Sequence, residues 1–232
     1  MRIFKDFIEA HKEIEREIKH NGIVYQSNTV QDKDVEENEN FLTKELIGYS
    51  FLVRNPDTES YISFLELNRK WLADEFIERI SQSLVNPGKA WMSRENMWKE
   101  FLEDDGTFSY TYSERIGRQI EDVISLLENV PFTRHAIITI YNSEIDNLRR
   151  DGKRRVPCSM YYNLFLRDEG GLKLHLIYNI RSNDFVNHFP YDIVLARNLQ
   201  EYIAMRVDVP IGDFIYQGGS LHVFHKDNEE IF

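Results

Sequence analysis

The sequence predicts an α+β fold, because helical and strand-forming segments are mixed without the regular strand–helix–strand alternation of a parallel α/β protein. Apolar residues recur at helical spacing in the first half of the chain. From Met160 onward, alternating segments and a hairpin dominate instead. We find no repeat, low-complexity tract or linker between the two halves, so residues 1–232 are expected to form a single domain.

The first half of the chain is predicted to contain a helix, a loop, a strand and further helical structure. An amphipathic helix opens the chain, on the spacing of Phe4, Phe7, Ile8, His11, Ile14 and Ile18. A polar loop over 28–40 follows, and a strand over 48–53 ends at the turn Asn55-Pro56-Asp57. Residues 61 to about 84 are predicted to be helical throughout, until Asn86-Pro87-Gly88 stops the helix.

The second half is predicted to be richer in strands. A helical stripe from Ile116 to Leu127 ends before Pro131, and a buried strand over 136–141 follows it. Strands over 160–166 and 172–180 form a hairpin, joined by a turn at 168–171. A helix over 193–207 and a strand over 213–224 complete the prediction.

Composition excludes several classes of function. The net charge of −11 repels polyanions, so broad nucleic-acid binding is not expected. No stretch approaches the ~20 apolar residues of a membrane span, and the start of the chain lacks the apolar run of a signal peptide. With only one cysteine, these features lead us to expect a cytoplasmic protein.

Cys158, the single cysteine, follows Arg154-Arg155-Val156-Pro157 and precedes an alternating strand. Cationic neighbours favour the thiolate, which is the reactive form of cysteine. The alternative is that the residue is a small buried hydrophobe. The basic residues around it are typical of a solvated loop, although arginines that converge locally could bind a phosphate. They are Arg149, Arg150, Lys153, Arg154 and Arg155.

Three polar segments of the second half carry the functional signal. They are Pro157-Cys158; Arg181-Ser182-Asn183-Asp184 with Pro190-Tyr191-Asp192; and Gly212-Asp213-Phe214 with Gly218-Gly219-Ser220-Leu221-His222. In this order they resemble the thymidylate synthase superfamily, over residues 71–224 or so. The resemblance implies a mixed sheet with packed helices and a homodimer. It also implies a reaction in which a thiolate adds to pyrimidine C6, so that C5 can take a one-carbon unit from 5,10-methylenetetrahydrofolate.

The resemblance assigns catalytic roles to residues of both halves. Cys158 is the nucleophile. Glu75 matches the glutamate that organises water and moves protons, with Glu78 as a rival because the alignment needs a one-residue gap. Tyr112 matches a tyrosine that assists proton removal from C5. Glu75 could instead be an exposed helix residue, and Tyr112 an ordinary packing aromatic.

The resemblance also assigns the phosphate site. Arg181 contacts the nucleotide phosphate beside the sulfur, and its field lowers the pKa of the cysteine. Ser182 adds a hydroxyl. Arg134 reaches across the dimer to the partner's phosphate, although His135 stands where the family has a second arginine. The alternative for Arg134 is a surface charge at the start of a strand.

The remaining binding residues concern the sugar and the folate. His222 matches the histidine that contacts the sugar hydroxyl, and Gly219 precedes it in the Gly-Gly pair. Asp184 matches the aspartate that holds the pterin ring, and Trp98 matches a tryptophan that lines the folate site. A structural role is the alternative for both His222 and Trp98.

Departures from the family pattern indicate the substrate. Asp192 stands where the family has an asparagine that recognises uracil, and an aspartate can accept a hydrogen bond from the 4-amino group of cytosine. Cytidylate 5-hydroxymethylases resemble this chain in that respect. The alternative is that Asp192 is a helix N-cap. Other departures are Ser159, Ile180, Ser220 and Phe224, the last of which makes a ribonucleotide admissible.

These observations predict a folate-dependent hydroxymethyltransferase that acts on CMP or dCMP. The sequence ends soon after the last motif, and the absence of a closing segment over the folate would favour water over hydride. Such an enzyme would serve modified-pyrimidine metabolism, such as antibiotic biosynthesis. The alternatives are a thymidylate synthase that methylates dUMP and a non-catalytic nucleotide-binding relative.

Overall fold

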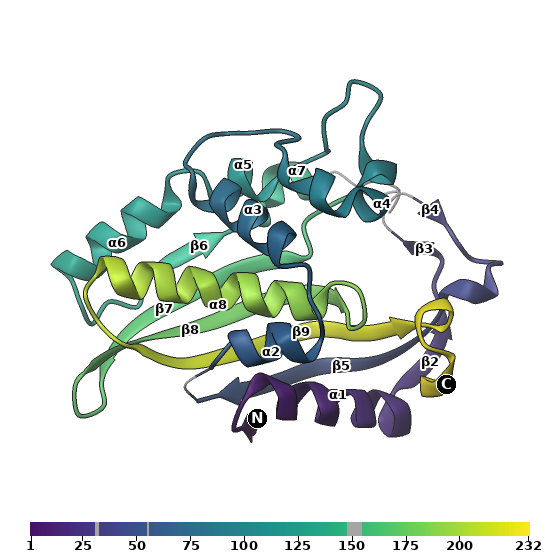
Figure 1. The fold of residues 1–232 in the computed structure, drawn as a ribbon, viewed down its shortest axis with the longest axis horizontal. Helices are drawn as coiled ribbons and strands as arrows, with labels where there is room; N and C mark the ends of the chain where they lie inside the picture. The colour runs from purple at the N-terminus through teal and green to yellow at the C-terminus, as the bar shows by residue number, and fades with distance from the viewer. Residues whose placement is uncertain (31–32, 55, 148–154) are drawn as a thin grey trace.

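A computed structural model describes residues 1–30, 33–54, 56–147 and 155–232. Its main sheet has seven strands in the order β1-β5-β9-β8-β7-β6, with β2 paired to β5 (Figure 1). The strands are β1 (Arg2–Phe4), β2 (Ile23–Gln26), β5 (Leu42–Val53), β6 (Ile137–Thr139), β7 (Ser159–Asp168), β8 (Leu172–Asp184) and β9 (Ile211–Phe224). The β1–β5 and β8–β9 pairs are parallel and the others are antiparallel, so the predicted mixed sheet is confirmed.

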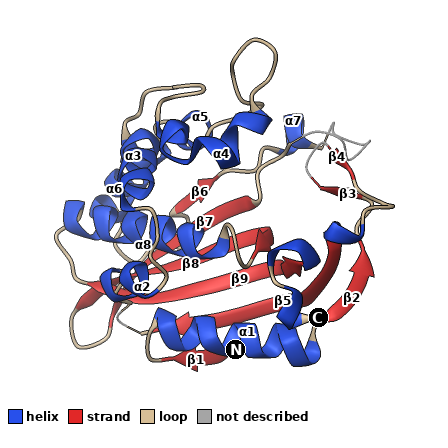
Figure 2. Ribbon diagram, turned by 45° about the vertical axis from the view of Figure 1, so that its right-hand side comes forward, coloured by secondary structure: helices blue, strands red, loops and turns tan. Residues whose placement is uncertain are grey.

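Helices α1, α2 and α8 cover one face of this sheet. Helices α3, α5 and α6 lie on the side of α8 away from α1 and α2, toward β6 (Figure 2). The helices are α1 (Phe7–Asn21), α2 (Glu59–Phe64), α3 (Arg69–Ile80), α4 (Glu95–Trp98), α5 (Tyr112–Ile116), α6 (Gln119–Asn129), α7 (Ser143–Asp146) and α8 (Phe189–Arg206). The helix-covered face of β7 carries the buried Tyr162, Leu164 and Leu166, whereas the alternate residues Tyr161 and Phe165 are at least partly exposed. No helix in the described ranges combines the length and apolarity needed to cross a membrane.

Two predicted helices are interrupted in the structure. The helix predicted over 61–84 is α2 and α3, because Glu66 adopts a positive φ of 51° and Asn68 caps α3 by accepting a hydrogen bond from the Trp71 amide. Gly117, with φ of 49°, likewise separates α5 from α6. These breaks are local and leave the apolar stripes on the core side.

The edges of other predicted elements also differ. Phe4 belongs to β1 rather than to the opening helix, which begins at Phe7 after the Asp6 cap. The predicted loop over 28–40 contains two short paired strands, β3 (Thr29–Val30) and β4 (Lys33–Asp34).

The sheet brings the three motif segments to one place. Cys158 lies just before β7, and Ser159 pairs with Ile180 near the end of β8. The parallel strands β8 and β9 end side by side, with Asp184 in register with His222. Because β7 runs antiparallel to β8, its beginning lies beside the ends of β8 and β9.

Candidate active site

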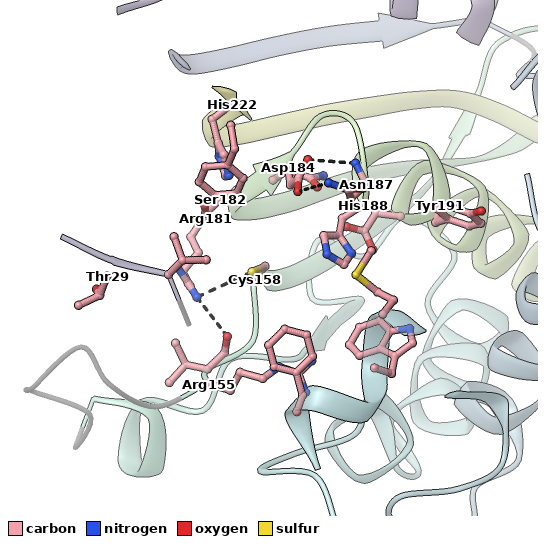
Figure 3. Close-up of a pocket in the computed structure, with 18 of the residues that line it drawn as sticks. Thr29, Arg155, Cys158, Arg181, Ser182, Asp184, Asn187, His188, Tyr191 and His222 are labelled. Carbon is pink, nitrogen blue, oxygen red and sulfur yellow. Dashed lines mark hydrogen bonds between the residues drawn. The ribbon is translucent and has the colours of Figure 1, made fainter. Parts of the chain in front are cut away.

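A cavity of about 950 Å³ opens where these strand ends meet (Figure 3). Most of the residues assigned to the site from sequence line it: Trp98, Tyr112, Cys158, Arg181, Ser182, Asp184, Asp192 and His222. Glu75, Arg134 and Gly219 are not among the residues that line this cavity. The volume is near the upper end of the range typical of small-molecule sites, ~300–1,000 Å³.

Arg181 lies directly beside the cysteine. Its Nε donates to the carbonyl of Pro157 at 3.0 Å, and its Nη2 donates to the carbonyl of Val156 at 3.1 Å. The same Nη2 lies 3.8 Å from the Sγ of Cys158 (Figure 3). Two backbone carbonyls therefore hold the guanidinium against the sulfur.

Gly219 contributes to this geometry without lining the cavity. A β-carbon at this position would lie 2.5 Å from the carbonyl oxygen of Arg181 on the neighbouring strand. Only a glycine lets β9 come this close to β8 beside Arg181. The residue lines a hollow on the sheet together with Tyr161 and Asn179.

The acidity of Cys158 differs from the expectation. Burial raises the pKa of the thiol, and this effect outweighs the charges of Arg181 and Arg155, which lower it. The expected lowering of the pKa by Arg181 is therefore present, but the effect of burial is larger. The thiol needs a base to accept its proton before it can attack. Arg154 and the other basic residues at 149, 150 and 153 lie outside the described residues.

Asp192 lies in the first turn of α8, but it is not the cap of that helix. The helix begins at Phe189, and His188 occupies the N-cap position, so the capping alternative is wrong. Burial raises the pKa of Asp192 to about 7, against the opposing charges of Arg79 and Arg94. The side chain can thus be either a carboxylic acid or a carboxylate near neutral pH.

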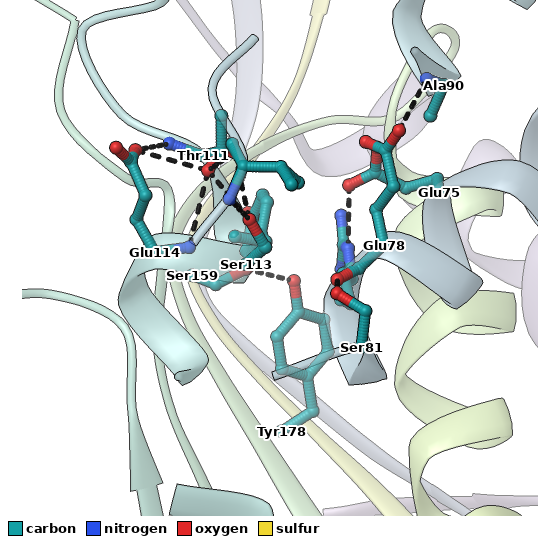
Figure 4. Close-up of polar contacts among 12 residues, drawn as sticks. Glu75, Glu78, Ser81, Ala90, Thr111, Ser113, Glu114, Ser159 and Tyr178 are labelled. Atoms are coloured by element: carbon teal, nitrogen blue, oxygen red, sulfur yellow. Dashed lines mark hydrogen bonds and ion pairs between the residues drawn. The ribbon is translucent and has the colours of Figure 1, made fainter. Parts of the chain in front are cut away.

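The two candidate glutamates on α3 have different environments (Figure 4). Glu78 accepts hydrogen bonds from the amides of Lys89 and Ala90, at 2.5 and 3.0 Å, and so holds the following loop. Glu75 accepts from Nε of Arg79 at 2.8 Å, and both residues line a small cavity of about 50 Å³ beside Tyr112. Because Glu78 is engaged with backbone, Glu75 is the better placed of the two.

Tyr112 extends the site into the core through hydroxyl groups. Its phenol lies 2.9 Å from Oγ of Ser159, which lies 2.7 Å from the phenol of Tyr178. Ser159 is fully buried. The serine that departs from the family pattern therefore fixes the orientation of Tyr112.

His222 lines the cavity from near the end of β9. Its Nδ1 lies 3.3 Å from Oγ of Ser220, whose hydroxyl also binds Glu45. The ring of Phe224 packs edge-on against the imidazole, with the centroids 4.9 Å apart. Phe224 thus supplies a surface without a hydroxyl where the sugar is expected.

Arg134 is exposed on the segment before β6, outside the cavity of its own chain.

Comparison with known proteins identifies the family. The family model described as thymidylate synthase matches residues 72–231. The chain belongs to the thymidylate synthase family. Curated relatives include thymidylate synthase 1 of Bacillus spizizenii, 27% identical over 149 residues, and the thymidylate synthase of Bacillus phage phi3T, 28% identical over 149 residues. Each match covers 59% of this chain but only 51% of the relative, so the chain spans about half the length of these proteins.

Solved structures show the same fold. Thermostable thymidylate synthase A of Bacillus subtilis superposes with a TM-score of 0.70 over 98% of this chain and 84% of that one, at 22% identity. Thymidylate synthase of T4 phage superposes with a TM-score of 0.70 over 96% of this chain and 78% of that one, at 21% identity. The predicted thymidylate synthase-like fold is confirmed.

Members of the thymidylate synthase family use 5,10-methylenetetrahydrofolate, and one wall of the cavity fits a flat aromatic ligand. Trp98 stacks on Trp71 at 6.2 Å and 14°, and the indole N–H of each is buried without a hydrogen-bond partner among the described residues. Asp184 also lines the cavity, although its carboxylate already accepts from two amides and from the side chain of Asn187. These residues fit the folate that the family uses.

Two further arginines belong to the thymidylate synthase-like site: Arg155, which the sequence pattern places in a solvated loop, and Arg79, to which it assigns no role. Arg155 does not lie in solvent: its guanidinium is 5.0 Å from the rings of Trp98 and Tyr110 and 4.8 Å from that of Phe101. Arg79 is buried and lines the cavity. The sequence could have indicated this burial, because Arg79 stands seven positions after Leu72 and so on the apolar face of α3.

Proposed function

We propose that this protein transfers a one-carbon unit to C5 of a cytidylate nucleotide and releases the 5-hydroxymethyl product. The observation that carries the proposal is Asp192 in the cavity, with a pKa of about 7. In the resemblance to the thymidylate synthase family, Asp192 stands where the family has an asparagine that recognises uracil.

Asp192 suits cytosine because one proton can be shared between its carboxyl group and N3 of the base. Cytosine N3 is a basic nitrogen and its 4-amino group donates, so an acid–base pair forms two hydrogen bonds with a single carboxyl group. Uracil already carries a proton on N3 and presents the less basic O4. A site that leaves a buried polar group unpaired discriminates strongly between such analogues.

The other residues take the roles that their positions support. Cys158 adds to C6, Arg181 and Ser182 bind the phosphate, and His222 contacts the sugar.

Proton transfer at C5 and binding of the cofactor complete these assignments. Tyr112 and Glu75 manage protons and water at C5, while Trp98 and Asp184 hold the cofactor. When bound, 5,10-methylenetetrahydrofolate supplies the one-carbon unit. Addition of water to the transferred carbon then gives the hydroxymethyl group.

A homodimer is part of the proposal. The face of the sheet opposite α8 carries partly exposed apolar side chains, including Tyr161, Phe165 and Ile177. Such a face is typical of an association surface. Arg134 of one protomer would then complete the phosphate site of its partner.

Thymidylate synthesis from dUMP is the second candidate function, and the names of the relatives favour it. Each of the relatives described above is called a thymidylate synthase. In this case, Asp192 would pair with N3–H of uracil. The cytidylate is favoured instead because the carboxylate form of Asp192 can accept from the 4-amino group of cytosine but cannot donate to O4 of uracil.

The decisive experiment is mass spectrometry of the products formed from CMP, dCMP and dUMP in separate incubations with methylenetetrahydrofolate. Hydroxymethylated cytidylate supports the proposal and names the sugar, whereas methylated uridylate supports the second candidate. Cys158→Ala should lower either rate by about 10⁴-fold or more, because it removes the nucleophile. No product from any nucleotide would contradict both functions and leave a non-catalytic nucleotide-binding protein.

A further inference from the structure

Arg79 is a buried arginine in the wall of the cavity to which no role has been assigned. It is 7% exposed, and it reaches the cavity from α3. Its guanidinium carbon lies 3.7 Å from the centre of the Tyr112 ring, and its Nε donates to Glu75 at 2.8 Å. These two contacts fix the plane and the direction of the guanidinium.

The guanidinium has more donors than the protein uses. An arginine carries five N–H groups, and among the described residues only the one on Nε has a hydrogen-bond acceptor. A buried donor without an acceptor is costly, so the remaining donors are suited to an acceptor on a bound molecule. Nη1 and Nη2 are not among the fully buried unpartnered atoms, so they retain accessible surface in a residue that lines the cavity.

Arg79 also acts on the two groups that face the base. Its charge opposes the effect of burial on Asp192, and its ring contact holds Tyr112. Burial lowers the pKa of Arg79, but the nearby Glu75, Tyr112 and Asp192 outweigh this effect and raise it, so the guanidinium stays protonated. It can therefore stabilise negative charge or donate a hydrogen bond, but it cannot transfer a proton.

We propose that Arg79 is a catalytic residue that stabilises the negative charge formed on the pyrimidine when Cys158 adds to C6. The inference rests on the proposed one-carbon transfer to C5. In this step, the thiolate electron pair forms the S–C6 bond. The C5=C6 π pair moves to C5 and, by conjugation, to N3 of cytosine or O4 of uracil. No group leaves, and Arg79 keeps its protons while its free N–H groups donate to the ring.

The alternative role for Arg79 is that of a counter-ion for Glu75 and Asp192, and Arg94 provides the matched control. Arg94 also lowers the pKa of Asp192, and its guanidinium lies 4.1 Å from the centre of the Tyr191 ring. Unlike Arg79, it is not among the described residues that line the cavity. Loss of a positive charge near Asp192 should lower the rates of both Arg79→Ala and Arg94→Ala. Loss of a contact with the base should lower only the rate of Arg79→Ala.

The test compares Arg79→Ala, Arg79→Lys and Arg94→Ala with the wild type. Two rates are measured for each: exchange of the C5 hydrogen of the nucleotide in D₂O, and product formation. We expect Arg79→Ala to lower kcat for both by about 100-fold or more, with a smaller change in KM. Millimolar guanidinium should restore part of the rate of Arg79→Ala, and Arg94→Ala should lose less than about tenfold without rescue.

Several results would overturn the inference. Equal losses in Arg79→Ala and Arg94→Ala, a loss confined to KM, or no rescue by guanidinium would make Arg79 a structural counter-ion. Melting temperatures identify variants that fail to fold. Arg79→Lys keeps the positive charge and should lose less activity than Arg79→Ala. If Arg79→Ala fails to fold, Arg79→Gln, which removes the charge, replaces it, and a kcat equal to that of the wild type in Arg79→Gln would contradict the inference. An inactive wild type would instead contradict the proposed function itself, which distinguishes the two failures.

Discussion

Two clusters next to the turn between β8 and α8 each contain a partly buried titratable side chain. Asp184 lines the cavity, whereas the next residue, Phe185, stacks on His11 with the ring centroids 4.5 Å apart. On α8, Phe189 packs in the His11 cluster, and Asp192, one turn later, lines the cavity. We call these regions the aromatic cluster and the cavity.

The two regions differ in how their polar atoms are satisfied. In the aromatic cluster, Nδ1 of His11 lies 3.0 Å from the hydroxyl of the fully buried Tyr61, so the protein itself supplies the partner. Burial lowers the pKa of His11 to about 4 and keeps the imidazole neutral. In the cavity, the indole N–H of Trp98 is buried without a partner among the described residues, and the carboxyl group of Asp192 faces two arginines.

This difference shows how one physical effect serves two purposes. Burial disfavours the charged form of both His11 and Asp192. The aromatic cluster resolves the penalty with a neutral hydrogen bond and contributes stability. In the cavity, polar groups stay without partners from the protein, which lowers the stability of the fold. A bound ligand can supply those partners, so the same groups are suited to binding.

The largest expected effect concerns the base that the cavity selects. Asp192→Asn replaces an acid with an amide that can donate to O4 and accept from N3–H of uracil. We expect the ratio of kcat/KM for cytidylate over uridylate to fall by about a thousandfold or more. His11→Gln is the control from the aromatic cluster and should leave the ratio unchanged. An unchanged ratio in Asp192→Asn would show that Asp192 does not contact the base.

The second prediction uses the pH dependence of stability in the cavity. The pKa of Asp192 rises from 3.8 in the unfolded chain to about 7 in the folded protein. The unfolded chain therefore loses its proton first, and the contribution of Asp192 to the free energy of unfolding should fall by roughly 3 kcal/mol as pH rises from 4 to 7. Urea unfolding of the wild type and of Asp192→Asn should give curves that converge or cross over this range. Parallel curves would contradict the raised pKa.

The third prediction concerns the aromatic cluster, where the free energy of unfolding should depend on pH in the opposite direction. The pKa of His11 falls from 6.5 in the unfolded chain to about 4 in the folded protein. As pH falls from 6.5 to 4, the unfolded chain takes up the proton first, so the wild type should lose roughly 3 kcal/mol of stability relative to His11→Gln. Urea unfolding at matched pH values measures this loss. If His11 and Asp192 moved stability in the same direction, the comparison between the two regions would fail.

Much of the site could be predicted from sequence because its chemistry depends on residue types in a fixed order. Cys158, Arg181, Asp184 and His222 stand at the ends of strands, and the resemblance assigned each of them before the sheet was known. The helix breaks at Glu66 and Gly117 were missed, because periodicity extends across a single residue of positive φ. Arg79 was missed although its spacing from Leu72 places it on the apolar face of α3, because an arginine is rarely buried.

The sequence by itself determined the class of fold, the segment order and the identity of the groups that meet at the strand ends. The fold class and segment order follow from local periodicity, whereas the groups that meet at the strand ends follow from the resemblance to the thymidylate synthase superfamily. Only the tertiary structure decided how acidic each group is and what each of the two glutamates on α3 binds. The pKa of Cys158 rises although arginines flank it, and Asp192 titrates near neutrality, because both depend on burial by residues distant in sequence. Glu78 is engaged by the amides of Lys89 and Ala90 and Glu75 by Arg79, which no spacing along α3 could show.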